Sequence, residues 1–364
     1  MNRPRPRPAF RLALTPVLAL LAMLALPAPV RATFSIVAYD SMTQELGVAV
    51  QSRAFSVGMA VPWAEAGVGA IATQASTNES FGPLGLDMLR KGSAAPEVVQ
   101  ALIAADSGSA HRQLGIVDAG GRSAAHTGAS CSAWAGHRTG RGYSIQGNIL
   151  AGEAVVAEME RAFLGTAGEL SARLLAALEA AQAAGGDKRG MQSAAILVVR
   201  PSDAYPEYRT RYVDLRVEDH KDPIREIRRV FQILEAQDLA EAHLRFAEAY
   251  DKAGKKDLAR VERERVGEAL RRALQRGEND ASTLNGLAWV TATNGVFLDE
   301  ALQAAERAVA LEPKNTGILD TLAEVHYRRG NADKAIEVIT RALEIAPEEK
   351  YLKEQLARFR SGTK

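Results

Sequence analysis

The sequence predicts an α+β domain, in which helices pack outside stacked antiparallel sheets, followed by an all-α helical domain. Two observations lead to this prediction. Up to residue 217, strand patterns alternate with pairs of helical patterns, which is typical of a layered arrangement. From Pro223 onward only helical patterns occur, and part of them repeats with a fixed period.

The composition bounds the class of protein. The chain has 364 residues, enough for two domains, and 47% of them are hydrophobic, enough for large cores. A formal net charge of +1 argues against nucleic acid as a partner. The single cysteine, Cys131, excludes an internal disulfide. The histidines show no metal-ligand spacing, so we expect neither a metal nor another cofactor.

Residues 1–32 have the features of a secretory signal peptide. A basic segment precedes an apolar run over residues 12–26, and the small residues Val30 and Ala32 follow at the positions that signal peptidase recognises. The apolar run is too short to span a bilayer comfortably. We therefore expect cleavage after Ala32, a periplasmic or secreted mature protein, and no membrane segment in it. The alternative is an uncleaved anchor helix.

The mature chain is expected to begin with a strand over 34–39, a turn, and a hairpin partner over 46–51. A third strand over 67–73 leads into a polar loop. The elements predicted after it are helices over 84–90 and 94–105, strands over 112–118, 122–126 and 143–147, helices over 153–164 and 170–184, and strands over 191–200 and 208–217.

The last third of the chain contains an internal repeat. Three positions recur 34 residues later, because Ala301, Ala308 and Pro313 correspond to Ala335, Ala342 and Pro347. This is the tetratricopeptide period, with alanine where paired helices pack closely. We expect a linker helix over 223–237 and tetratricopeptide-like repeats over 238–364, with a degenerate third repeat over 238–272. The alternative is a pair of unrelated helical hairpins.

Thr33 is the residue on which a functional prediction depends. Cleavage after Ala32 would give Thr33 a free α-amine beside its hydroxyl. These are the two groups, a base and a nucleophile, that an N-terminal nucleophile uses. An α-amine has an unperturbed pKa of about 7.7–8.0, so it can accept the hydroxyl proton near neutral pH. Threonine is also a common strand residue, so this residue alone does not decide the matter.

Eight segments together resemble the DUF1028 family, and they cover about residues 33–219: Thr33–Ala38, Gly47–Arg53, Val61–Ala70, Gln74–Asn78, Phe81–Gly85, Ala125–Gly128, Gln146–Gly152 and Gly185–Ala194. The resemblance implies a four-layer αββα fold similar to the N-terminal nucleophile (Ntn) hydrolases, although the function of the family is unknown. Cytoplasmic members begin Met-Thr-Phe-Ser, so methionine removal would expose the threonine that signal peptidase would expose here.

The sequence departs from the proteasome-type threonine hydrolases. They use a lysine to tune the nucleophile, whereas no lysine occurs here between Thr33 and Lys91. Gln51 stands where a similar proteasome stretch carries an aspartate. Arg53 can supply positive charge but does not act as a base. The departure leaves the α-amine as the expected base.

Other residues complete the predicted site, each with a plainer alternative. Asn78 is expected to donate to an oxyanion, or else to order its loop as an Asx-turn. Asn148 has the same two interpretations, and His126 either binds substrate or is a hydrogen-bonded structural residue. Asp187 and Arg189 lie in a glycine-rich turn that could hold a carboxylate or an amine, unless it is only a surface turn.

These observations predict an exported Ntn-type amidohydrolase that cleaves an amide bond in a small molecule or peptide. The expected catalytic residues are Thr33 and Asn78, and the expected substrate-binding residues are Gln51, Arg53, His126, Asn148, Asp187 and Arg189. The repeats are expected to bind a partner protein or to mediate self-assembly. The alternative is a non-catalytic ligand-binding scaffold whose repeats are the working surface.

Overall fold

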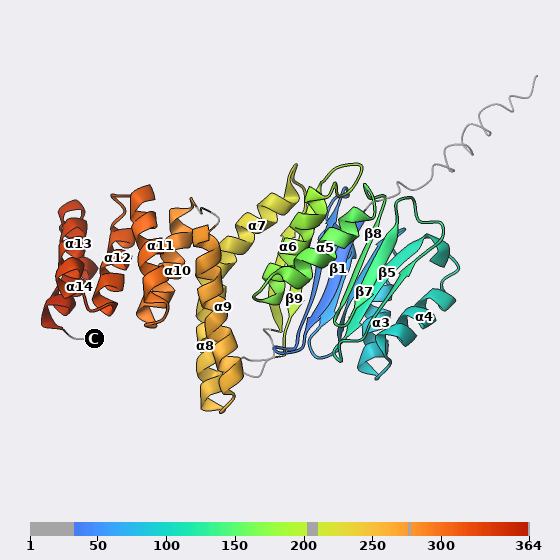
Figure 1. Cartoon of the computed structure of the whole chain (residues 1–364), viewed down its shortest axis with the longest axis horizontal. Helices are drawn as coiled ribbons and strands as arrows, with labels where there is room; N and C mark the ends of the chain where they lie inside the picture. Colours follow the sequence, from blue (N-terminus) through green and yellow to red (C-terminus); the bar gives the residue numbers. More distant parts are fainter. Residues whose placement is uncertain (1–32, 202–209, 276, 278, 363–364) are drawn as a thin grey trace, which may run out of the picture.

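The computed structural model describes residues 33–201, 210–275, 277 and 279–362. The predicted signal peptide lies outside the described residues, as do positions 208 and 209 of the last predicted strand. The chain forms an N-terminal domain of mixed helix and sheet and a C-terminal all-helical region beside it (Figure 1). No helix in the described ranges is long and apolar enough to cross a membrane.

Two antiparallel sheets stack face to face in the N-terminal domain. Sheet A has six strands in the order β10-β9-β2-β1-β8-β7, and sheet B has four in the order β3-β4-β5-β6. The strands are β1 (Thr33–Asp40), β2 (Glu45–Ser52), β3 (Pro62–Glu65), β4 (Gly69–Ala75), β5 (Arg112–Asp118), β6 (Ser123–Thr127), β7 (Gly136–Gly140), β8 (Tyr143–Asn148), β9 (Ser193–Val199) and β10 (Arg211–Val217). The sequence prediction lacked β3 and β7.

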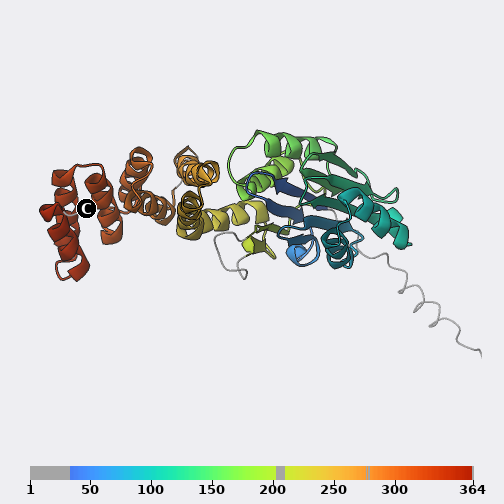
Figure 2. The same cartoon turned by 90° about the horizontal axis from the view of Figure 1, so that it is seen from below.

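Helices cover the outer face of each sheet and complete four layers (Figure 2). Three of them lie on sheet A: α5 (Ala154–Gly165), α6 (Leu170–Ala183) and α7 (Pro223–Leu234). Two lie on sheet B: α3 (Phe81–Arg90) and α4 (Ala95–Ala105). The short elements α2 (Val57–Ala60) and η1 (Ser109–His111) lie in connections. The predicted α+β class with an αββα order of layers is therefore confirmed.

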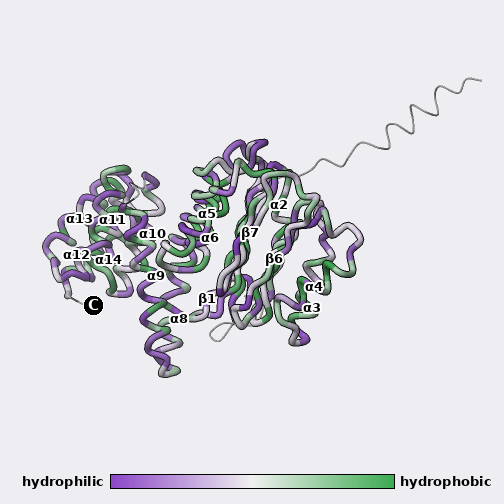
Figure 3. The backbone as a smooth tube through the Cα atoms, turned by 45° about the vertical axis from the view of Figure 1, so that its right-hand side comes forward, coloured by the Kyte–Doolittle hydropathy of each residue, from purple (hydrophilic) through white to green (hydrophobic). Residues whose placement is uncertain are grey.

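Alternation along β1 decides which side chains enter which layer. Phe34 and Ile36 are fully buried in the core between sheet A and its helices, where they pack with Met159 of α5. Val37 is fully buried in the core between the two sheets. Since successive strand residues point to opposite faces, Thr33 faces the space between the sheets, on the same side as Val37. Figure 3 shows hydrophobic colours along the strands of both sheets.

The expected linker helix over 223–237 corresponds to α7 and the start of η3 (Glu235–Leu239). Its buried side chains Ile224, Ile227 and Phe231 belong to the core between sheet A and its helices. Residues of this helix therefore complete the outer layer of the N-terminal domain instead of merely connecting two domains.

The C-terminal region consists of antiparallel helices that lie side by side (Figure 1). They are α8 (Ala240–Lys252), α9 (Lys256–Gln275), α10 (Ala281–Thr293), α11 (Leu298–Leu311), α12 (Thr316–Arg328), α13 (Ala332–Ile345) and α14 (Lys350–Ser361). The alanines that revealed the period, Ala301, Ala308, Ala335 and Ala342, have no exposed surface. Small residues at these positions allow α11 and α13 to pack closely against their neighbours.

Buried charges join the two parts of the chain. Glu45, at the start of β2, pairs with Arg265 of α9 at 2.7 Å and with Arg200 at 3.4 Å. Arg200 also pairs with Glu262 at 2.8 Å. These four side chains are at most 4% exposed, so each charge depends on its partners rather than on water.

A second buried group adjoins this cluster. His243 of α8 lies between Glu169, at 3.1 Å, and Glu262, at 2.6 Å. Burial alone would lower the pKa of His243, but its hydrogen bonds to the two carboxylates outweigh burial and raise the pKa. Burial alone would raise the pKa values of Glu169 and Glu262, but the hydrogen bond and charge of His243 lower both to about 2.

Replacing Glu45 by glutamine removes the charge that faces two buried arginines. We expect the free energy of unfolding to fall by roughly 3–5 kcal/mol, as when one partner of a buried ion pair is lost. The matched control is Glu264→Gln on α9, whose carboxylate pairs with Arg271 at the surface and should cost at most about 1 kcal/mol. Urea unfolding measures the loss of unfolding free energy in each variant. Equal losses in Glu45→Gln and Glu264→Gln would show that the buried cluster does not join the domains.

Stability should have a maximum in pH. The raised pKa of His243 stabilises the fold fully below its ordinary value of 6.5, and this contribution disappears as the pH rises through the folded-state pKa. The lowered pKa values of Glu169 and Glu262 stabilise it above about 4.5, and this contribution disappears as the pH falls toward 2. Urea unfolding should therefore be hardest between about pH 4.5 and 6.5. His243→Gln should remove the loss on the alkaline side, and an unchanged alkaline loss would contradict this assignment.

Candidate functional site

Thr33 is held between two strands at the end of sheet A. It lies opposite Ser52 of β2 on one side and opposite Asn148 of β8 on the other. Its Oγ1 lies 3.0 Å from Oγ of Ser52, and the residue is only 2% exposed. A residue with a strand on each side is fixed in position.

Buried amide side chains connect Thr33 to sheet B. Nε2 of Gln74, on β4, donates to the carbonyl of Thr33 at 3.3 Å and to Oε1 of Gln113 at 2.7 Å. Nδ2 of Asn148 donates to the same Gln113 oxygen at 3.1 Å. All three amide residues have no exposed surface. The space between the sheets is therefore polar at this end, and its hydrogen bonds fix the surroundings of Thr33.

The glycine-rich turn contacts the residues that directly follow Ser52 and Asn148, the two strand partners of Thr33. The carboxylate of Asp187 has no exposed surface and accepts the backbone N–H of Arg53 at 3.1 Å and that of Arg189 at 2.8 Å. It also pairs with the Arg189 guanidinium at 3.0 Å. On the other side, the N–H of Lys188 donates to the carbonyl of Ile149 at 3.1 Å. The turn thus connects the residue after Ser52 with the residue after Asn148.

Two residues beside the site have unusual backbone conformations. Ile149, directly after Asn148, has φ 53°, and Ala75, directly after Gln74, has φ 70°. A β-branched residue with positive φ is a genuine outlier, and such strain concentrates at functional sites. Oδ1 of Asn148 is in addition buried without a hydrogen-bond partner in the part of the chain that the structure describes.

Gln51 does not face Thr33, which corrects the expectation that it takes the place of an acidic residue there. It lies opposite Phe34 and Ala194, whose side chains belong to the core between sheet A and its helices. Cross-strand partners share a face, so the amide of Gln51 points away from the Thr33 hydroxyl. The equivalent position beside the hydroxyl is occupied by Ser52.

Asn78 is not brought to Thr33 either. Its Oδ1 accepts the N–H of Ser80 at 3.2 Å and the hydroxyl of Ser80 at 2.7 Å, which is the Asx-turn alternative. Hydrogen bonds from Arg112 first, then from the Gly108 amide and the Asn78 side chain, lower the pKa of Asp106. The Asn78 amide thus orders its own loop instead of facing Thr33.

His126 lies on the outer face of sheet B. It is opposite Leu114, which is buried beneath α3 and α4, and a ring nitrogen bonds the carbonyl of Ser109 at 2.9 Å. The predicted residues that the structure does gather around Thr33 are Arg53, Asn148, Asp187 and Arg189. Whether they bind a substrate stays a prediction.

Three residues of the site were missed by the sequence analysis: Ser52, Gln74 and Gln113. The hairpin provides a signal for Ser52, because pairing from the turn at 41–44 places it opposite Thr33. Gln74 and Gln113 could have been noticed as amides at the ends of otherwise apolar strands. Among the described residues, no group of three or more His, Cys, Asp or Glu side chains could hold a metal ion.

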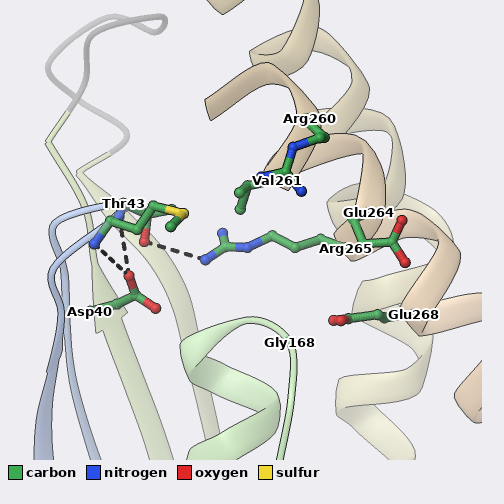
Figure 4. A pocket seen from close by; sticks show the side chains of 9 residues that line it. Asp40, Thr43, Gly168, Arg260, Val261, Glu264, Arg265 and Glu268 are labelled. Atoms are coloured by element: carbon green, nitrogen blue, oxygen red, sulfur yellow. Dashed lines mark hydrogen bonds between the residues drawn. The ribbon is translucent and has the colours of Figure 1, made fainter. Parts of the chain in front are cut away.

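A cavity lies at the opposite end of β1 (Figure 4). It has a volume of about 230 Å³ and lies between the hairpin turn, the loop at Gly168, and α9. Arg265 crosses it toward Thr43, whose hydroxyl accepts a hydrogen bond at 3.3 Å. Since Thr33 and Asp40 are the two ends of β1, and a strand rises about 3.3 Å per residue, this cavity is roughly 23 Å from the Thr33 site.

The fold and site define a layered αββα domain with a polar site at the end of a central strand. The chain belongs to the family of unknown function DUF1028, whose model matches residues 33–227, more than half of the chain. A tetratricopeptide-repeat model matches residues 298–358, within the region of the predicted repeats. No curated protein matches the chain.

A solved structure agrees with the family assignment. The crystal structure of protein SPO2555 from Silicibacter pomeroyi, a DUF1028 protein, is 34% identical, with a TM-score of 0.53, and covers 58% of this chain and 89% of that chain. An O-GlcNAc transferase mutant of Thermobaculum terrenum is 24% identical, with a TM-score of 0.24, and covers 33% of this chain and 22% of that chain. The second similarity is too low to carry an argument.

Asp187→Ala should loosen the turn around the site. It leaves the Arg53 and Arg189 amides and one guanidinium without their buried acceptor, which we expect to cost about 3 kcal/mol of unfolding free energy. Amide hydrogen exchange over 185–192 should become faster. The control is Asp219→Ala, an exposed carboxylate bonded to Gln192 of the same turn. Unchanged exchange in Asp187→Ala would contradict the role given to the carboxylate.

Proposed function

We propose that this chain is an exported amidohydrolase of the Ntn type, in which Thr33 leads the mature protein after cleavage behind Ala32. Oγ1 of Thr33 is the nucleophile and its own α-amine is the base. The observation that carries the proposal is the position of Thr33 at the start of a central strand, with its hydroxyl 3.0 Å from Ser52 and a second strand on its other side.

The reaction would proceed in two steps. Oγ1 attacks the carbonyl carbon of the amide while the α-amine takes the hydroxyl proton, and the departing nitrogen then receives that proton as the C–N bond breaks. This leaves an ester between Thr33 and the acyl group. Water attacks the ester, the α-amine again takes a proton, and the proton returns to Oγ1 as the acid leaves.

The orphan oxygen of Asn148 supports a free amine at Thr33. Oδ1 is a buried acceptor without a partner in the described residues, and it belongs to the strand residue opposite Thr33. A backbone amide has one N–H, whereas a free α-amine has two when it is neutral and three when it is protonated. Cleavage before Thr33 would thus provide additional N–H donors on the residue opposite Asn148. One of them could satisfy the buried Oδ1 of Asn148, which otherwise costs free energy.

The tetratricopeptide region is proposed to bind a partner protein in the periplasm or outside the cell. It contacts the end of the β1–β2 hairpin that is remote from Thr33, through Glu45 and Arg265. A partner bound on these helices would therefore leave the Thr33 site open. The sequence feature that favours a non-catalytic scaffold instead is the absence of lysine between Thr33 and Lys91.

Thr33→Ala should abolish amide hydrolysis, with a loss of at least about 10³-fold, whereas Thr33→Ser should keep part of it. A threonine-directed β-lactone should add one label to the exported protein and none to Thr33→Ala. The control Thr139→Ala changes an exposed threonine of β7 and should be labelled normally.

Intact-mass measurement of the exported protein tests the same proposal independently. A mature chain that begins at Thr33 is the expected result. A chain that begins at Ser35 or later, or that keeps residues before Thr33, would overturn the catalytic proposal, as would normal labelling of Thr33→Ala.

A further inference from the structure

We infer that the substrate of the Thr33 site carries a carboxylate group and that Arg53 binds it. This inference rests on the proposed function, because it names the class of amide that the site would take. It depends on three observations: the position of Arg53, the shape of the turn around it, and the distribution of charge.

Arg53 directly follows Ser52, the residue opposite Thr33. Consecutive Cα atoms are 3.8 Å apart and paired strand residues about 5 Å apart, so the Cα atoms of Arg53 and Thr33 lie within roughly 9 Å of each other. An extended arginine side chain is somewhat shorter than this separation, and the guanidinium of Arg53 is held at the glycine-rich turn by the carbonyl of Arg189. A carboxylate a few bonds from the scissile amide could therefore reach the guanidinium.

The glycine-rich turn lies against this guanidinium. Nη1 of Arg53 donates to the carbonyl of Arg189 at 2.5 Å. A Cβ atom at Gly190 would lie 3.0 Å from the same Nη1, and Gly190 has φ +105°, a conformation that other residues rarely adopt. One N–H donor thus orients the guanidinium of Arg53. Its remaining N–H donors can bind a carboxylate in bidentate geometry.

The charge at the turn is not balanced. The only carboxylate within the turn, Asp187, is buried and already paired with Arg189. Within the described ranges, Arg53 forms no ion pair, and it is exposed to solvent. Glu218 and Asp219 are hydrogen-bonded to Ser56 and Gln192 instead. A positive charge therefore remains available at the rim of a site whose interior consists of neutral amides and hydroxyls.

The test compares paired chromogenic amides on the mature chain, residues 33–364. One pair is N-succinyl-4-nitroanilide and its methyl ester, with the carboxylate on the acyl side. The other is N-acetyl-5-amino-2-nitrobenzoate and N-acetyl-4-nitroaniline, with the carboxylate on the leaving group. For at least one pair, kcat/KM should favour the carboxylate by about tenfold or more. Arg53→Gln should reduce this preference to less than about twofold, and Arg53→Lys should keep part of it.

Lys188→Gln is the matched control, because it removes an exposed positive charge of the same turn and leaves Arg53 in place. It should keep most of the preference. A preference that survives Arg53→Gln, or active enzyme without any preference in either pair, would overturn the assignment of Arg53.

Equilibrium binding separates this inference from the proposed function. Thr33→Ala is titrated with N-acetylglycine and with N-acetylglycinamide, which lacks the carboxylate, and NMR shifts or calorimetry report the affinity. Binding of the acid that Arg53→Gln abolishes supports the carboxylate site, and if no hydrolysis is found in the native protein, only the catalytic proposal fails. Absence of Arg53-dependent binding overturns the carboxylate site whether or not hydrolysis occurs.

Discussion

The antiparallel register of β1 with its two neighbours is the constraint on which the site depends. It places Thr33 opposite Ser52 and Asn148, and it directs Phe34 into the core beneath the helices. A slip of one residue would exchange the two faces, so that the phenylalanine would enter the polar space between the sheets. The free energy of burying the alternate apolar residues of β1 therefore also fixes the position of the polar residue at its end.

The same hairpin connects the site to the rest of the chain. Its turn end carries Glu45, whose buried partners Arg200 and Arg265 lie at the boundary with the helical region. Its open end carries Thr33 and Ser52. Ion pairs therefore hold the turn end of this pair of strands, while apolar packing of Phe34 holds the open end. Because the helical region contacts this pair of strands at the turn end, a partner protein could bind the repeats without approaching Thr33. The charge cluster at the hairpin, together with the packing of Tyr212 of β10 against Phe246 of α8, joins the two parts of the chain into one unit.

Much of the fold could be predicted because apolar periodicity reports buried elements directly. β3 and β7 were missed, since Pro62–Glu65 and Gly136–Gly140 are short, and neither shows an apolar alternation. The site was predictable only in part, because sequence spacing does not reveal the face of a sheet. Gln51 adjoins Ser52 in the chain but faces the helices, and Gln113 reaches Asn148 across the two sheets. Such contacts depend on register and layer stacking, which no local pattern specifies.

The proposed mechanism offers a physical reason why a lysine can be absent. A buried amine loses hydration, which disfavours its charged form, and positive charge nearby acts in the same direction. The immediate neighbours of Thr33 are hydroxyl and amide groups. The charge of Arg53 lies in the adjoining segment, where the charge of Arg189 is paired with that of Asp187. In a chain that begins at Thr33, as we propose, burial among neutral groups would disfavour the charged form of the α-amine and leave it able to accept a proton from Oγ1. Arg53, which would attract a carboxylate-bearing amide, would also oppose protonation of this base, so substrate recognition and activation of the nucleophile would both depend on the charge of Arg53.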